Sequence, residues 1–153
     1  MGLITDTHCH LDFEAFDEDR ELVLQRACEA GVRKILNPGV DLSSSQKAIK
    51  LAEAYEDVFA AVGIHPNSAQ DMHEDSIQII YDLATRKGKG THPKAKAIGE
   101  IGLDYYRDRT PHEIQRRVFR DQLKLAEDLK LPVVIHNRQA TSDLLQILND
   151  WHR

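Results

Sequence analysis

The stretch TPHEIQRRVFRDQLKLAEDLKLPVVIH, residues 110–136, contains one helix followed by one strand and indicates the class of fold. Apolar side chains recur at helical spacing in its first part, at Ile114, Val118, Leu125 and Leu129. The run LPVVIH that ends the stretch is apolar at successive positions, which is typical of a parallel strand buried on both faces. The stretch therefore predicts an α/β protein in which helices cover a parallel sheet.

The start of this helix carries a capping signal. Thr110 and Glu113 are spaced as in a capping box, and Pro111 between them suits the first position of a helix. We therefore expect a helix over residues 110–130 with Thr110 as its N-cap.

The same order of strand and helix is expected five times along the 153 residues. The expected strands lie in residues 2–5, 33–39, 58–66, 95–104 and 131–136, and the expected helices in residues 17–31, 43–57, 74–88, 110–130 and 140–151. A parallel sheet with such helices is either an open doubly wound sheet or a (β/α)8 barrel. Five units are too few to close a barrel of eight strands.

Composition restricts the class of protein and its compartment. The chain is 41% hydrophobic and 29% charged, and no apolar run approaches the ~20 residues that span a bilayer. We expect no secretory leader, because no charged and then apolar segment opens the sequence, and the two cysteines, Cys9 and Cys28, do not make a disulfide framework. We therefore expect a cytoplasmic protein with no membrane partner.

Residues that can bind metal ions or phosphate follow four of the five expected strands. They are His8 and His10 at the end of the first strand, His65 at the end of the third, Glu100 and then Asp104 at the end of the fourth, and His136 and then Arg138 at the end of the fifth. In both architectures the carboxyl ends of the strands gather at the functional edge of the sheet. This placement predicts one shared site.

The strongest metal signal is the pair His8 and His10. Residues i and i+2 of a strand point to the same face, so the two histidines can hold one ion, whereas Cys9 points to the other face and is excluded as a ligand. The two oxygens of Glu100 could serve two ions, and His136 leaves an apolar run where it needs a metal or a carboxylate as partner. A single histidine or glutamate in such a position is usually structural. The prediction of a metal site therefore rests on the four residues together.

Four segments resemble signatures of the TatD-like metal-dependent hydrolases. They are DTHCHLD at residues 6–12, GIHP at 63–66, AIGEIGLDY at 97–105 and LPVVIHNR at 131–138, and they occur in the family order along the whole chain. The family belongs to the amidohydrolase-type metal-binding barrels and is associated with magnesium-dependent DNase activity. The resemblance implies a (β/α)8 TIM-barrel type of fold and a magnesium-dependent deoxyribonuclease that cleaves phosphodiester bonds with a metal-activated water.

The resemblance also implies roles for individual residues. It implies that the metal ligands are His8, His10, Glu100 and His136, that Glu100 and His136 act in catalysis, and that His65, Asp104 and Arg138 contact substrate phosphate or hold the ligands in place. The implied cofactors are one or two divalent ions, Mg²⁺ before Zn²⁺, Mn²⁺ or Fe, since a mixed set of histidines and carboxylates also suits the last three. The implied partner is DNA.

The resemblance covers only the first part of the family's barrel. Members complete eight strands and take a further histidine from strand six and an aspartate from strand eight, and neither position lies within residues 1–153. We therefore expect a single partial TIM-barrel domain over residues 1–153, with five βα units. Two alternatives stay open here: a related hydrolase of a small ester or amide, and a truncated barrel without catalytic activity.

Overall fold

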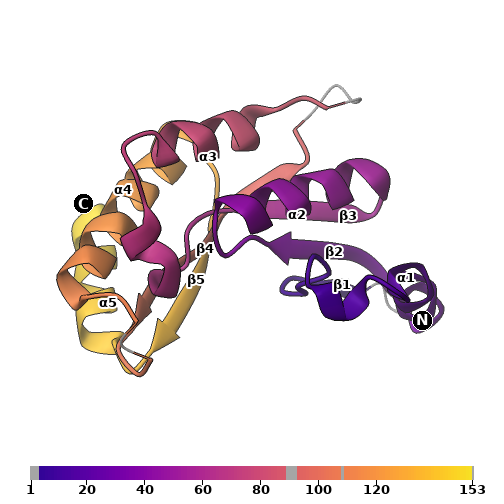
Figure 1. Ribbon diagram of the computed structural model, residues 1–153, viewed down its shortest axis with the longest axis horizontal. Coiled ribbons are helices and arrows are strands. Elements are labelled where there is room, and N and C mark those ends of the chain that lie inside the picture. Colours follow the sequence, from indigo (N-terminus) through magenta and orange to yellow (C-terminus); the bar gives the residue numbers. More distant parts are fainter. Residues whose placement is uncertain (1–3, 89–92, 108, 153) are drawn as a thin grey trace.

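A computed structural model describes residues 4–88, 93–107 and 109–152 of the protein. The strands are β1 (Ile4–Asp6), β2 (Val32–Pro38), β3 (Val58–Val62), β4 (Ala95–Asp104) and β5 (Val133–Arg138). The helices are α1 (Arg20–Glu29), α2 (Leu42–Ala54), α3 (Ser76–Thr85), α4 (His112–Leu129) and α5 (Thr141–His152), with short 3-10 helices η1 (Glu14–Phe16) and η2 (Pro66–Asp71). Strand and helix alternate as the sequence predicts (Figure 1).

The strands form one parallel sheet in the order β1-β2-β3-β4-β5. The sheet curls into a half-barrel, with α2, α3 and α4 along one side of it (Figure 1). Consecutive strands are neighbours throughout, as in a (β/α)8 barrel and unlike a doubly wound sheet, in which the strand order reverses. The TIM-barrel type of fold is therefore confirmed, and the alternative of a doubly wound sheet is wrong.

The start of α4 differs from the capping box that the sequence predicts. The helix begins at His112, and Pro111 is its N-cap, with a ψ angle of 135° that lies outside the helical region. Thr110 is therefore one residue too far from the helix to cap it. Its buried Oγ1 has no hydrogen-bond partner in the described part of the chain. The prediction of Thr110 as N-cap is wrong because Pro111 does not adopt the helical conformation.

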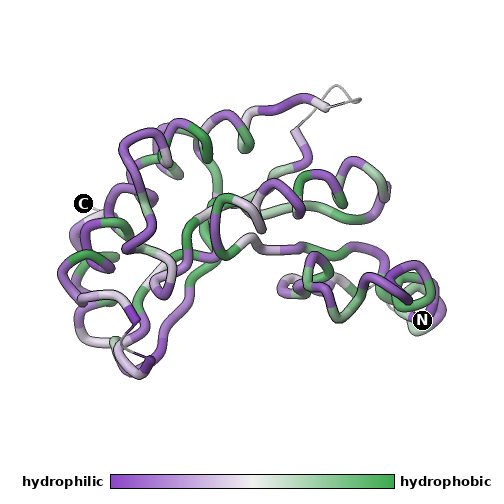
Figure 2. Tube along the Cα trace, in the orientation of Figure 1, coloured by the Kyte–Doolittle hydropathy of each residue, from purple (hydrophilic) through white to green (hydrophobic). Residues whose placement is uncertain are grey.

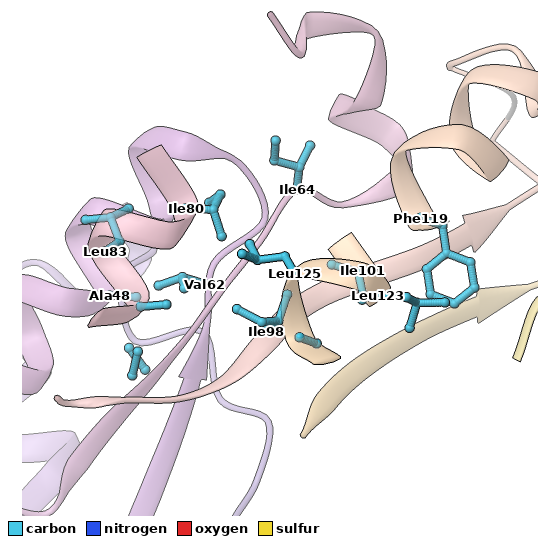
Figure 3. Close-up of a cluster of buried hydrophobic side chains, with 14 of the residues drawn as sticks. Ala48, Val62, Ile64, Ile80, Leu83, Ile98, Ile101, Phe119, Leu123 and Leu125 are labelled. Atoms are coloured by element: carbon cyan, nitrogen blue, oxygen red, sulfur yellow. The ribbon is translucent and has the colours of Figure 1, made fainter. Parts of the chain in front are cut away.

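The hydrophobic core lies between the sheet and the helices that pack on it. Hydrophobic segments follow the central strands and the neighbouring helix faces (Figure 2). Phe119, Leu123 and Leu125 of α4 pack in one cluster with Ile98 and Ile101 of β4 (Figure 3), and none of these side chains is more than 6% exposed. Removing this much apolar surface from water is the main favourable term in folding. The helix α4 therefore holds β4 in place.

Two buried glutamines of α4 bind the backbone where β3 and β4 end. Gln122 Oε1 accepts a hydrogen bond from the N–H of Ile64 at 2.7 Å, and Gln122 Nε2 donates to the Ile64 carbonyl at 2.9 Å. Gln115 Oε1 accepts from the N–H of Asp104 at 2.8 Å, and Gln115 Nε2 donates to the Asp104 carbonyl at 3.0 Å. Each side-chain amide thus acts as the backbone of a neighbouring strand would. The backbone next to His65 and at Asp104 is therefore tied to α4.

Replacing Gln122 with leucine should lower the free energy of unfolding by about 1–3 kcal/mol. The leucine fills similar space, but it leaves the N–H and carbonyl of Ile64 buried without partners. Urea unfolding followed by circular dichroism measures the loss. Gln78→Leu is the matched control, because Gln78 is exposed on α3. An equal change in the two variants would contradict the role of Gln122.

Candidate metal centre

His8, His10 and Glu100 converge into one group of side chains that can bind a metal ion. The Nε2 atoms of His8 and His10 are 3.2 Å apart. Glu100 Oε2 lies 3.3 Å from His8 Nε2 and 3.6 Å from His10 Nε2. Glu100 is buried, whereas His8 is exposed, so solvent reaches this group from the histidine side.

The two histidines lie just beyond β1, because the strand ends at Asp6. The N–H of Cys9 still donates to the Leu36 carbonyl at 3.1 Å, which continues the alignment of the chain with β2. His8 and His10 therefore lie on one side, and Cys9 packs against the hydrophobic core. Burial, and then the charge of Asp6, raises the pKa of the Cys9 thiol. A protonated thiol is a poor ligand, which supports the exclusion of Cys9.

Glu100 reaches this group through an irregularity in β4. The register between β4 and β5 shifts around Glu100, where β4 has one more residue than β5, as in a bulge. The N–H of Glu100 donates to the carbonyl of Gly39, beyond the end of β2, at 2.7 Å. The chain approaches closely here, since a Cβ on Gly63 would lie 2.9 Å from the backbone of Gly99. Glu100 was expected at the end of a strand, but it lies within β4.

The other carboxylate oxygen of Glu100 faces His136. Glu100 Oε1 lies 3.0 Å from His136 Nδ1, and His136 Nε2 lies 3.2 Å from Asp104 Oδ2. The hydrogen bond with Glu100 raises the pKa of His136 above its ordinary value, although burial opposes it. Burial raises the pKa of Glu100, but the hydrogen bond with His136 and the nearby histidines outweigh it and hold that pKa below its ordinary value. Both nitrogens of His136 thus face ionised carboxylates.

Asp104 is fully buried and orients His136. Its Oδ1 accepts from the N–H groups of Tyr106 and Arg107 at 3.1 and 2.9 Å, and its Oδ2 accepts from Asn67 Nδ2 at 3.2 Å. Burial raises the pKa of Asp104, but the hydrogen bonds from Arg107 and Asn67 outweigh it and keep that pKa low. A carboxylate behind a histidine fixes the ring and its tautomer, as in many metal sites. Asp104 was predicted either to contact substrate phosphate or to hold a metal ligand in place, and its burial favours the second role.

His65 lies beside His136, in a tautomer that does not suit metal binding. The two ring centroids are 4.2 Å apart. His65 Nδ1 accepts a hydrogen bond from the backbone N–H of Asn67 at 3.1 Å, so the neutral ring carries its proton on Nε2. Burial, and then the neighbouring His136, lowers the pKa of His65 to about 4. His65 is near enough to Glu100 and His136 to form a metal-binding group with them. In this tautomer, however, its Nε2 carries a proton and offers a hydrogen-bond donor, whereas a metal ion needs a lone pair.

His10 has the opposite tautomer. Its Nδ1 lies 3.0 Å from the carbonyl oxygen of Pro38, which can only accept, so Nδ1 carries the proton and Nε2 keeps its lone pair. Phe13 stacks on the imidazole, with ring centroids 4.7 Å apart and an interplanar angle of 10°. These two contacts direct the free nitrogen of His10 toward Glu100.

The distances in the first group fit a bound cation. Ligand atoms at about 2.0–2.2 Å from a tetrahedral metal ion are about 3.3–3.6 Å from one another. The separations among His8 Nε2, His10 Nε2 and Glu100 Oε2 are 3.2, 3.3 and 3.6 Å. An imidazole lone pair and an ionised carboxylate are also the protonation states that metal binding requires. These residues therefore fit a divalent cation with nitrogen and oxygen ligands.

Arg138 ends β5 at the same edge of the sheet. Its Cζ lies 3.9 Å from the centroid of the Tyr106 ring, and its carbonyl accepts from the N–H of Tyr105 at 2.9 Å. Sequence reasoning missed Tyr106, Asn67 and Phe13, although each contacts a predicted site residue. Each follows a predicted site residue by two or three positions, and this proximity is the only signal in the sequence.

A protein-family model described as TatD related DNase matches residues 5–153. The chain belongs to the TatD-related DNase family. Among curated relatives, the uncharacterized metal-dependent hydrolase YabD of Bacillus subtilis (strain 168) is 43% identical over 148 residues, which are 97% of this chain and 56% of YabD. The 3'-5' ssDNA/RNA exonuclease TatD of Shigella flexneri serotype 5b is 35% identical over 146 residues, which are 95% of this chain and 54% of that protein. The predicted family is confirmed.

A solved structure of the family agrees with the fold. The crystal structure of YjjV, a TatD homolog from Escherichia coli K12, has a TM-score of 0.87 at 36% identity and matches 97% of this chain and 56% of its own. The chain spans about half the length of the curated relatives that it matches. Within residues 4–88, 93–107 and 109–152, none of the helices is long and apolar enough to cross a membrane.

Proposed function

We propose that this chain carries metal-binding residues of a hydrolase that cleaves phosphodiester bonds in nucleic acid, with DNA as the predicted substrate. The observation that carries the proposal is the position of Glu100 between two sets of histidines. Its Oε2 faces His8 and His10, and its Oε1 faces His136. A carboxylate placed in this way suits a bridge between two cations, as in two-metal phosphodiesterases.

Each residue of the centre has a role in this proposal. His8, His10 and Glu100 would hold one divalent ion, and Glu100 and His136 would hold another. Bound ions of this kind supply a water of lowered pKa and stabilise charge on the phosphoryl oxygens. Asp104 keeps the His136 ring in its orientation. The sequence predicts Mg²⁺ first, but imidazole ligands suit Mn²⁺, Zn²⁺ and Fe better, so the test compares metals.

His65 and Arg138 are the proposed contacts to substrate. His65 can donate from Nε2, because its Nδ1 accepts from the backbone of Asn67. Arg138 offers a planar guanidinium, which can pair with two oxygens of one phosphate. Both side chains would position the phosphate beside the metal centre, and neither would be a ligand of the metal.

The relatives support nucleic acid as the substrate class. The Shigella flexneri relative is named a 3'-5' ssDNA/RNA exonuclease, and the family model is described as a DNase. A preference for DNA and a cytoplasmic location stay predictions of the sequence. Because the chain spans about half the length of its relatives, a full-length TatD exonuclease serves as the positive control in the test.

The test measures metal-dependent cleavage of labelled single-stranded DNA, with a matched RNA and a p-nitrophenyl ester as alternative substrates. We expect cleavage of the nucleic acid to stop in EDTA and to return when excess Mg²⁺, Mn²⁺ or Zn²⁺ is added. Cleavage that persists in EDTA would contradict a metal-dependent reaction. Hydrolysis of the ester without cleavage of DNA or RNA would favour the alternative of a small-molecule hydrolase.

A further inference from the structure

An exposed tyrosine lies beside the site, and its hydroxyl is not used by the fold that the structure describes. Tyr106 is 57% exposed, and its hydroxyl makes no hydrogen bond to the described residues. The neighbouring Tyr105 behaves differently. Its hydroxyl donates to Asp143 Oδ2 at 2.7 Å and accepts from Arg116 at 3.1 Å, and its ring stacks on His112 with centroids 3.6 Å apart. Tyr105 therefore joins β4 to α4 and α5, whereas the Tyr106 side chain stays exposed and contacts the Arg138 guanidinium through its ring.

The backbone holds Tyr106 at the edge of the metal centre. The N–H of Tyr106 donates to Asp104 Oδ1, and Oδ2 of the same carboxylate lies 3.2 Å from His136 Nε2. The guanidinium of Arg138 lies over the Tyr106 ring, at 3.9 Å from its centroid. β4 and β5 end together at this edge (Figure 1). One carboxylate thus connects the tyrosine to a candidate metal ligand.

Exposed aromatic rings are few in the described residues, and two of them lie at this site. The large exposed hydrophobic side chains include three aromatic rings, Phe13, Tyr81 and Tyr106. Phe13 stacks on His10, and Tyr106 lies against Arg138, whereas Tyr81 belongs to the helix α3. Of the three rings, the two that contact candidate site residues are therefore the ones placed to meet a ligand bound at this site.

We propose that Tyr106 is a stacking platform for a nucleobase of single-stranded nucleic acid, with Arg138 binding the phosphate next to that base. This inference rests on the proposed function and deepens it by naming a residue that would contact a base of a single-stranded substrate. Every base has a π-face, so such a platform accepts bases without a sequence preference. In a duplex these faces are covered by neighbouring pairs, and only an unpaired base can use the ring. The guanidinium against the ring places a positive charge where the backbone phosphate follows the base.

Fluorescence anisotropy with a labelled single-stranded DNA, in EDTA to prevent cleavage, tests this proposal on the chain. We expect Tyr106→Ala and Tyr106→Leu to weaken binding about 5- to 150-fold, because both remove the π-face. Tyr106→Phe keeps that face and should bind like the wild type. Tyr81→Ala removes an exposed tyrosine on α3 and is the matched control, with unchanged binding expected.

A second readout reports stacking directly. A 2-aminopurine base in the DNA should lose fluorescence on binding to the wild type, and this quenching should disappear in Tyr106→Leu. Wild-type affinity in Tyr106→Ala or Tyr106→Leu would overturn the proposal and leave the proposed function standing, and so would weak binding by Tyr106→Phe. A wild-type chain that neither binds single-stranded DNA or RNA in EDTA nor cleaves them with added metal would overturn the proposed function as well.

Discussion

Replacing Glu100 with glutamine should weaken the binding of Mn²⁺ and Zn²⁺ by at least about 100-fold. The reason is that both candidate groups share this carboxylate, with one oxygen facing His8 and His10 and the other facing His136. Glutamine keeps the shape but removes the charge and one of the two oxygen ligands. Loss of a residue that only supports a ligand already costs about 10–100-fold, so loss of a shared ligand should cost more. Isothermal titration calorimetry measures the affinity.

Two further variants sharpen this experiment. His136→Ala removes one side of the centre only, so binding at His8, His10 and Glu100 should remain. Glu127→Gln changes an exposed glutamate of α4 and should leave the titration unchanged. If Glu100→Gln titrates like the wild type, the cation binds elsewhere and the centre described above is not a metal site.

Replacing Leu123 with alanine should lower the free energy of unfolding by about 2–5 kcal/mol. Leu123 is 1% exposed and packs in the core between α4 and β4 (Figure 3). The variant loses buried apolar surface and leaves a cavity, because a close-packed core relaxes only in part. Urea unfolding monitored by circular dichroism gives the difference.

The matched control for this prediction is Leu145→Ala. Leu145 is 53% exposed on α5, and the same truncation there should change the free energy of unfolding by no more than about 0.5 kcal/mol. Similar losses in the two variants would mean that burial between α4 and β4 does not dominate the stability of this chain.

The order of the elements could be predicted from the sequence because it depends on local patterns. The segment 95–104 was expected to contain a strand ending at Glu100, and in the structure the strand β4 occupies the whole of it, Ala95–Asp104. Apolar runs and helical spacing are properties of neighbouring residues, and they survive in any fold that buries them. The start of α4 was missed because Thr110 and Glu113 fit a capping box only if Pro111 is helical.

The candidate site could be predicted in outline for a related reason. Parallel strands bring their carboxyl ends to one edge, so polar residues that follow several strands must lie near one another. The structure brings His8, His10, Glu100 and His136 together there. Their roles as metal ligands stay predictions of the sequence.

Finer features of the site depend on contacts between distant parts of the chain. The place of Glu100 within β4 involves a hydrogen bond to Gly39, and Gln122 binds Ile64, which lies 58 positions earlier. In the sequence, Gln122 stands between Asp121 and Leu123, and no nearby residue indicates its partner. The tautomer of His65 depends on a nearer partner, the backbone N–H of Asn67 in η2, which the sequence pattern does not indicate.

The two buried glutamines of α4 also make the site a cooperative unit. Gln122 is bonded to the residue before His65, and Gln115 to Asp104 itself, so one helix carries both attachments. A fluctuation that lifts α4 from the sheet would release the loop of His65 and the carboxylate behind His136 together. The segments that carry His65 and Asp104 are therefore expected to open together, at the free energy of detaching a whole helix.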